Sequence, residues 1–142
     1  MSRALVARAA AIWVAILVLA VANGAVRESV LIPWLGRTMG LVSSGAVLCA
    51  VVLLVSGICM PWVRPRSARD SWFVGVLWVG LTVAFEFGFG AVVQHRTWHD
   101  MVQPYLFRDG NIWPVVLAVI LVAPRLGYGL IAHPSADRSS DS

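Results

Sequence analysis

Four long apolar stretches, separated by short polar breaks, dominate the sequence. They predict helices over about residues 8–26, 39–62, 71–94 and 112–131, each close to the ~20 residues that a helix needs to cross the bilayer core. None shows the alternation of polar and apolar positions that is typical of membrane β-barrel strands. Because lipid offers the backbone no hydrogen-bond partners, these stretches must form helices. The pattern predicts an all-α, polytopic membrane protein with four transmembrane helices.

The four stretches define residues 1–133, which we interpret as a single four-helix transmembrane domain, and the Ser- and Asp-containing residues 134–142 as a disordered cytoplasmic tail. The first stretch follows Arg3 and Arg8 and contains Ala20-Val21-Ala22, a pattern that also fits a cleavable signal peptide. We favour an uncleaved first span because its apolar character continues as far as Val26.

The composition supports a membrane location. Of 142 residues, 59% are hydrophobic and 13% are charged, which leaves too little polar surface to cover a soluble core. The length has room for four or five crossings and not for a separate catalytic domain. The net charge of +4 is spread over the polar breaks, so we expect lipid headgroups as partners and no nucleic acid.

The two cysteines give no sign of a disulfide or a cofactor. Cys49 and Cys59 lie ten positions apart in one apolar stretch, about 15 Å apart on a helix, which is too far to pair. We interpret both as small buried apolar residues and expect no cofactor.

Arginines near the ends of the spans predict the orientation. Those expected on one side are Arg3, Arg8, Arg64, Arg66, Arg69, Arg125 and Arg138, and those on the other are Arg27, Arg37, Arg96 and Arg108. Because basic residues favour the cytoplasmic side, both termini are predicted to lie in the cytoplasm. The outer connections carry Trp34, Trp98, Tyr105 and Trp113, which predict an interfacial aromatic belt.

A short similarity links the two outer connections. Residues 24–26 followed by 33–37 resemble residues 90–92 followed by 104–108, and each pair of segments bridges two spans on the same side. The match is consistent with two parallel helical hairpins, as some transporters use. Chance similarity between two interfacial loops is the alternative.

Glu86 is the most informative single residue, because a carboxylate inside an apolar span costs at least about 2.5 kcal/mol unless it is paired, protonated or hydrated. Helical rise places Glu86 roughly 25 Å from Arg69 and Arg27 roughly 28 Å from Arg8, so the two reach a similar depth. We therefore expect Arg27 to be the partner of Glu86. Alternatively, Arg27 forms a surface pair with its neighbour Glu28.

Helical spacing adds polar neighbours to this predicted centre. Gly75, Thr82, Glu86 and Gly90 fall along one stripe of the third span, and a stripe of small residues permits close helix contact. We expect the stripe to turn Glu86 toward the bundle or an oligomer interface, with Thr82 and Asn23 as hydrogen-bond partners. A structural ion pair that fixes helix register and a functional site are both consistent with this pattern.

A weak metal-binding pattern lies in the second outer connection. His95 and His99 are four residues apart and Asp100 follows, so the three side chains are candidate ligands for one metal ion. No fourth ligand is evident, and histidines that face the headgroups are the favoured interpretation.

Two segments carry a resemblance to a known group. Residues 23–28 with 33–37, and residues 81–90, resemble stretches of uncharacterised small bacterial four-helix inner-membrane proteins. The resemblance covers most of the chain between Asn23 and Pro124. It implies bacterial origin, an inner-membrane location and the four-span topology, and it implies no particular activity.

Three functions are consistent with these features. The leading hypothesis is an oligomeric transporter or channel component that moves a small ion or solute, with Glu86 as its protonatable group. In it Arg27 sets the charge state of Glu86, Asn23 and Thr82 line the path, and Glu28 is a further residue of the transport site. The second is a non-catalytic subunit or assembly partner of a larger membrane complex. The third is a lipid-headgroup enzyme that uses Glu28, His95, His99 or Asp100, and the lack of recognisable catalytic motifs makes it the weakest.

Overall fold

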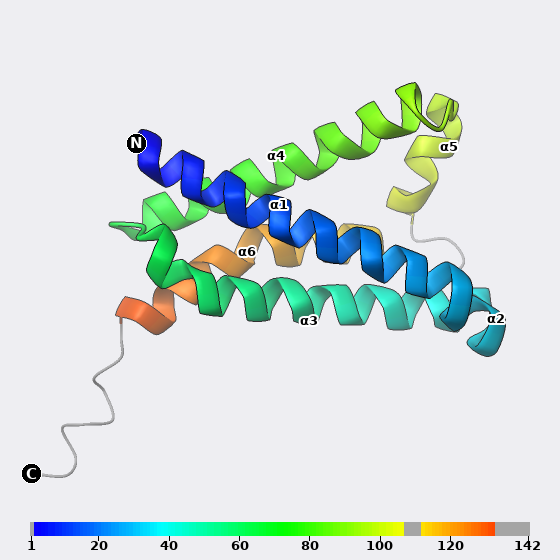
Figure 1. Cartoon of the computed structure of the whole chain (residues 1–142), viewed down its shortest axis with the longest axis horizontal. Helices are drawn as coiled ribbons and strands as arrows, with labels where there is room; N and C mark the ends of the chain where they lie inside the picture. Colours follow the sequence, from blue (N-terminus) through cyan, green and yellow to red (C-terminus); the bar gives the residue numbers. More distant parts are fainter. Residues whose placement is uncertain (1, 107–111, 133–142) are drawn as a thin grey trace, which may run out of the picture.

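The computed structural model describes residues 2–106 and 112–132, and every regular element in this part of the chain is helical (Figure 1). In chain order the elements are α1 (Arg3–Val26), the π-helix η1 (Arg27–Leu31), α2 (Ile32–Leu35), α3 (Arg37–Val63), α4 (Ala68–Val92), α5 (Trp98–Val102), the 3₁₀-helix η2 (Gln103–Leu106) and α6 (Trp113–Ala132). Four helical segments are long and apolar enough to cross a membrane. The all-α, four-span prediction is confirmed at this level. The predicted tail at 134–142 lies outside the described residues.

The first helical segment is longer than the sequence pattern predicts. The polar residues after Val26 do not form a loop, because α1 continues through η1 into α2 and gives one helical segment of 33 residues that ends at Leu35. Gly36 then adopts a φ of 87°, a left-handed conformation that glycine takes at little cost. The chain therefore reverses at a single residue, and α3 begins at Arg37.

Side-chain caps fix the starts of three helices. The hydroxyls of Ser2, Ser67 and Thr97 accept hydrogen bonds from the backbone N–H groups three residues later, at the starts of α1, α4 and α5. Arg64 closes α3 in a left-handed conformation, with its N–H donating to the Met60 carbonyl at 2.9 Å. These caps make residues 64–67 a short, defined hinge between α3 and α4.

The helix α6 packs between α3 and α4, while α1 packs against the same two helices. Two glycines permit the close approach of α6. A Cβ on Gly75 of α4 would lie 2.1 Å from the Leu121 carbonyl oxygen, and one on Gly127 of α6 would lie 3.0 Å from the Ser56 carbonyl oxygen. Bulkier residues at these positions would separate the helices.

The core lies along the contact lines of these four helices. Its largest fully buried side chain is Trp78, whose indole N–H donates to the Ala9 carbonyl at 2.8 Å. Leu5, Ala9 and Ile16 place α1 in the same core. Cys49 and Cys59 on α3 are both free thiols.

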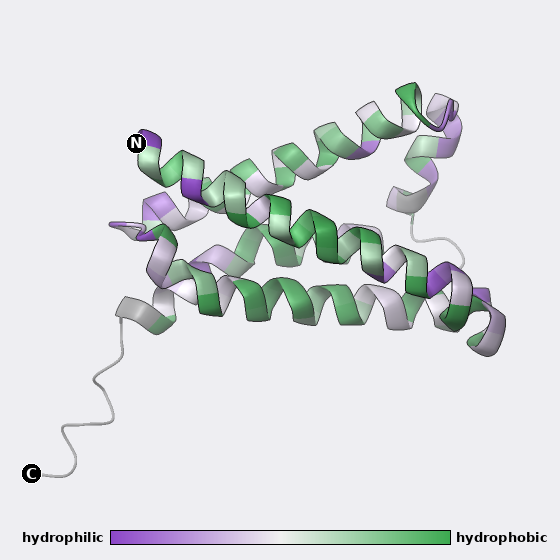
Figure 2. Cartoon of the chain, viewed as in Figure 1, coloured by the Kyte–Doolittle hydropathy of each residue, from purple (hydrophilic) through white to green (hydrophobic). Residues whose placement is uncertain are grey.

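Apolar residues cover most of the outer surfaces of the long helices, and polar residues gather at their ends (Figure 2). At one end, which we call the hinge end, lie the start of α1, residues 64–67 and the end of α6 (Figure 1). At the other, which we call the short-helix end, lie η1, α2, α5 and η2. The distribution is that of a multi-pass membrane protein.

Candidate functional site

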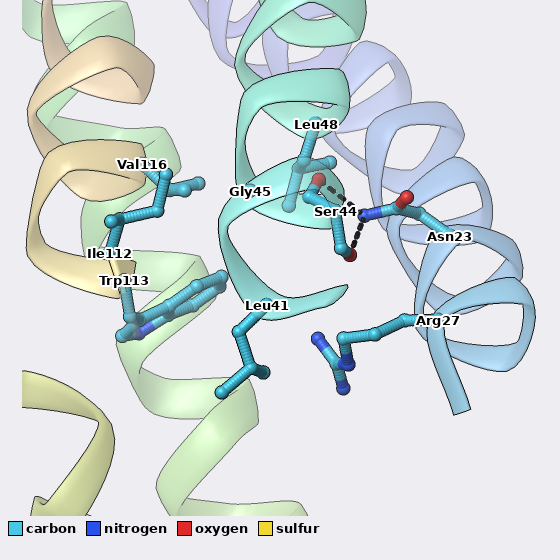
Figure 3. Close-up of a pocket in the computed structure, with 9 residues that line it drawn as sticks. All are labelled: Asn23, Arg27, Leu41, Ser44, Gly45, Leu48, Ile112, Trp113 and Val116. Carbon is cyan, nitrogen blue, oxygen red and sulfur yellow. Dashed lines mark hydrogen bonds between the residues drawn. The ribbon is translucent and has the colours of Figure 1, made fainter. Parts of the chain in front are cut away.

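A small polar cavity lies at the short-helix end, between α1, α3 and α6 (Figure 3). Its volume is about 30 Å³, which is room for about two water molecules. The residues that line it are Asn23, Arg27, Leu41, Ser44, Gly45, Leu48, Ile112, Trp113 and Val116. Two of them, Asn23 and Arg27, belong to the predicted polar centre.

Asn23 is held by the second spanning helix. Its side-chain nitrogen donates to the Ser44 carbonyl at 3.1 Å and to the Ser44 hydroxyl at 2.9 Å (Figure 3). Ser44 is fully buried, so this pairing satisfies polar groups that would be costly to leave alone in an apolar helix interface. The structure gives Asn23 a partner on α3 and not on α4, where it was predicted.

The charge pattern gave no indication of Ser44. A different signal points to it, because Gly40, Ser44, Leu48, Val52 and Ser56 recur at every fourth position of α3 and are all buried. Such spacing marks one face of a helix. A polar residue on a face of this kind needs a partner on a neighbouring helix, and here that partner is Asn23.

Arg27 stands at the point where α1 becomes the π-helix η1. Its Nε lies 3.3 Å from Glu28 Oε1, and its side chain is 34% exposed. Figure 3 shows the guanidinium beside the cavity, below Asn23 and Ser44. A π-turn inserts an extra residue into a helix and occurs frequently at functional sites. Here the π-helix changes the direction in which the side chains of Arg27 and the following residues point relative to those of α1.

The predicted ion pair between Arg27 and Glu86 does not form. Within the described residues Arg27 pairs with Glu28, the alternative that the sequence left open, and Glu86 has no ion pair. The reason is the path of α4, which contacts α1 through residues such as Trp78 and then diverges from it toward the short-helix end (Figure 1).

The stripe predicted on the third span is only partly turned inward. Gly75 contacts α6, Gly90 contacts Met101 of α5, and Thr82 accepts a hydrogen bond from the Trp13 indole at 3.0 Å. The Thr82 hydroxyl also donates to the Trp78 carbonyl at 2.7 Å. Glu86 itself is exposed on the surface of the single chain. Thr82 is therefore a bridge between α1 and α4, and it does not line the cavity beside Asn23.

Aromatic residues fasten α5 and η2 to the end of α4. The Phe87 ring lies 5.3 Å from Trp98 and 5.8 Å from Tyr105, measured between ring centroids. Burial raises the pKa of the Tyr105 hydroxyl, the neighbouring Trp113 side chain lowers it, and the charge of Glu86 raises it further. Tyr105 thus lies within reach of both Glu86 and Trp113. Through Trp113, this aromatic cluster adjoins the polar cavity.

The candidate metal ligands do not come together. His95 adopts a left-handed conformation with a φ of 51° and precedes α5, whereas His99 and Asp100 lie within α5. The four-residue spacing consequently does not place both histidines on one helix face. His99 contacts Gln103 at 3.2 Å, and the backbone N–H of Asp100 donates to the Thr97 hydroxyl. Across residues 2–106 and 112–132, no group of three or more potential metal ligands is close enough to hold an ion.

The geometry thus defines a cavity with a cation and an amide at its edge, and, on another helix that diverges from it, an exposed carboxylate. No protein-family model, curated protein or solved structure matches the chain. The functional interpretation of these residues therefore rests on their chemistry and placement.

Proposed function

We propose that this chain is an oligomeric transporter or channel component of a bacterial inner membrane, with both termini in the cytoplasm. It moves a small ion or solute, and Glu86 is its protonatable group. The observation that carries the proposal is the exposure of the Glu86 carboxylate on a membrane-spanning helix, with no ion pair in the described part of the chain.

The placement of Glu86 supports a subunit interface. Glu86 lies six residues before the end of α4, about 9 Å along the helix. An ionised carboxylate that faces acyl chains at that depth raises the free energy of the protein in the membrane, and polar or protein surroundings remove this cost. A second copy of the chain packed against this face of α4 would supply those surroundings. Exposed apolar residues on the same side of α4, Trp72, Val76 and Phe89, would add apolar contact to that interface.

The cavity volume also favours a path between chains. About 30 Å³ beside Asn23 and Arg27 holds water but leaves no passage for a solute through one four-helix unit. In the proposed oligomer, Glu86 lines the path at the interface. Arg27, with Glu28 as its partner, supplies a positive charge at the same end of the bundle, and Asn23 and Thr82 hold the helices on either side.

The experiment is flux in proteoliposomes that contain the purified full chain. Proton flux is followed with an enclosed pH-sensitive dye, and monovalent cations are tested one at a time as co-substrates. We expect Glu86→Gln to lower the rate at least about tenfold, in line with the loss of a proton-transfer group. The matched control is Asp100→Asn, which removes an exposed carboxylate at the same end and is expected to retain most of the flux. Equal flux from wild type and a folded Glu86→Gln variant would reject the role.

The same exposed carboxylate also supports a second candidate, a non-catalytic subunit of a larger membrane complex, in which an unrelated subunit covers Glu86. Purification from native membranes in mild detergent separates the two. Recovery as a homo-oligomer supports transport by copies of this chain, and constant recovery with unrelated subunits supports the second candidate. The third hypothesis, a lipid-headgroup enzyme, gains nothing from the geometry, because Glu28 lies on η1 while His95, His99 and Asp100 are dispersed around α5.

A further inference from the structure

We infer that the hinge end carries a binding site for the headgroup of one anionic phospholipid. A groove of about 530 Å³ lies there, between the start of α1 and the end of α3. Three arginines line it, Arg8, Arg64 and Arg66, together with apolar residues that include Leu5 and Val63. This inference shares with the proposal above the cytoplasmic orientation of the hinge end, and is otherwise independent of it, since it concerns the opposite end of the molecule.

Two of the three arginines are held in place by local structure. The Arg8 guanidinium lies 5.8 Å from the centroid of the Trp62 ring, and its Nη1 donates to the Trp62 carbonyl at 3.4 Å. Arg64 has a left-handed backbone, with φ 56° and ψ 57°, a conformation that costs a residue other than glycine about 1–2 kcal/mol. An arginine kept at a strained position whose geometry suits glycine better indicates that its side chain has a use.

The charges of this groove are not neutralised within the described residues. None of the three arginines forms an ion pair there, and the acid nearest in sequence, Asp70, accepts a hydrogen bond from the Arg66 backbone N–H at 3.1 Å. Asp70 thus serves the hinge backbone and not a guanidinium. Arginine side chains grouped in this way bind phosphate oxygens through paired N–H donors.

The apolar part of the groove favours a lipid over a free anion. The apolar floor of the groove consists of Leu5 and Val63, which belong to the packed interior, and of the more exposed Ala4 and Pro65. Two helices long enough to span a membrane end at the groove, and in a bilayer such ends reach the level of the lipid phosphates. Basic pockets between spanning helices on the cytoplasmic side are typical sites for anionic headgroups. A phospholipid can place its phosphate on the arginines and its glycerol and upper acyl chain against the apolar floor.

The test is native mass spectrometry of the delipidated full chain titrated with phosphatidylglycerol or with zwitterionic phosphatidylcholine. We expect one phosphatidylglycerol to bind preferentially, and Arg64→Gln and Arg66→Gln each to weaken it about fivefold. The matched control is Arg69→Gln, because Arg69 is an exposed arginine at the same end that does not line the groove. The affinity of the Arg69→Gln variant for phosphatidylglycerol is expected to change less than about twofold. Arg64→Gly is a further variant that keeps the cap geometry while removing the cation.

The outcomes divide clearly. Selective loss in the Arg64 and Arg66 variants, with Arg69→Gln unaffected, supports the site. Equal loss in all three would show unspecific attraction to a basic surface and overturn it. Equal affinity for both lipids, or displacement of phosphatidylglycerol by millimolar inorganic phosphate, would overturn the assignment to a lipid headgroup. Circular dichroism of each variant confirms that the helices are intact, and Arg66→Gln decides the question if the Arg64 variants do not fold.

Discussion

The four long helices and the short helix α5 are held in the structure in different ways. Among the long helices, backbone groups approach one another directly, as where Gly127 of α6 meets the Ser56 carbonyl of α3. Between α5 and the end of α4, contacts run through flexible or aromatic side chains, such as Met101 against Gly90 and Trp98 against Phe87. We therefore expect substitutions to cost more stability among the long helices than at the attachment of α5.

The largest expected effect comes from forcing apart the backbone contact between α4 and α6. Gly75→Ala places a methyl group against the Leu121 carbonyl oxygen, and neither backbone can yield, so we expect a loss of about 2–3 kcal/mol in the free energy of unfolding. Gly90→Ala meets only the Met101 side chain, with 3.1 Å to its sulfur, and should change stability by less than about 1 kcal/mol. Thermal unfolding in detergent micelles compares the two. Similar losses of stability in Gly75→Ala and Gly90→Ala would remove the distinction between the packing of the long helices and the attachment of α5.

A pair of tryptophan variants makes the same comparison without changing a backbone. Trp78→Phe removes the hydrogen bond to the Ala9 carbonyl and leaves a void in the core, and we expect a loss of about 2 kcal/mol. Trp98 is 71% exposed, so Trp98→Phe should cost less than about 1 kcal/mol while keeping an aromatic ring against Phe87. Chemical unfolding of both variants checks the order. A larger loss for Trp98→Phe would mean that α5 is part of the cooperative core.

Arg64 at the hinge end and His95 at the short-helix end both adopt a left-handed conformation although neither is glycine. Replacing either residue by glycine should raise the free energy of unfolding by a small amount. Arg64→Gly relieves backbone strain while the cap to Met60 remains, so we expect a gain of about 1 kcal/mol in stability. His95→Gly relieves similar backbone strain. Because the segment around His95 can open locally without unfolding the bundle, we expect a smaller gain in the free energy of global unfolding. Melting temperatures of the two variants test this order. A loss of stability in Arg64→Gly would show that its side-chain contacts outweigh the strain.

The smallest expected effect is a pH dependence confined to the short-helix end. Because burial raises the pKa of Tyr105 in the folded chain, the unfolded chain loses that proton first as the pH rises past about 10. Stability is then lost with increasing pH, and it is lost less steeply in Tyr105→Phe. Unfolding measured between about pH 8 and pH 11 checks the slope. Parallel slopes for wild type and Tyr105→Phe would contradict the assignment to Tyr105.

Hydropathy was sufficient to predict four spanning helices, because in lipid the backbone leaves a long apolar segment few alternatives to a helix. It did not predict that the first helix would continue to Leu35. Arg27, Glu28 and Ser29 are polar and Pro33 lacks a backbone N–H, features that usually end a helix. In the structure the π-helix η1 stands directly before α2, and Pro33 takes one of the first two positions of α2. The reversal was instead determined by Gly36.

The polar centre was predicted only in part, because counting residues gives the depth of a side chain and not its direction. Depth alone placed Arg27 and Glu86 together, whereas Arg27 pairs with Glu28 in the structure. The divergence of α4 from α1 and the insertion of η1 change the direction in which each side chain points. Likewise, His95 and His99 keep a helical spacing in the sequence, but a left-handed residue separates them in space.

The unbroken helical rod from Arg3 to Leu35 has a mechanical consequence. With 33 residues it measures about 50 Å, well beyond the ~30 Å of the hydrocarbon layer, so it must lean or protrude. Trp34, 84% exposed near its tip, is suited to rest among headgroups and set that lean. A thicker bilayer would reduce the tilt of this helical segment from the bilayer normal. Membrane thickness would thereby change the distance between the end of the segment at Leu35 and the ends of the neighbouring helices.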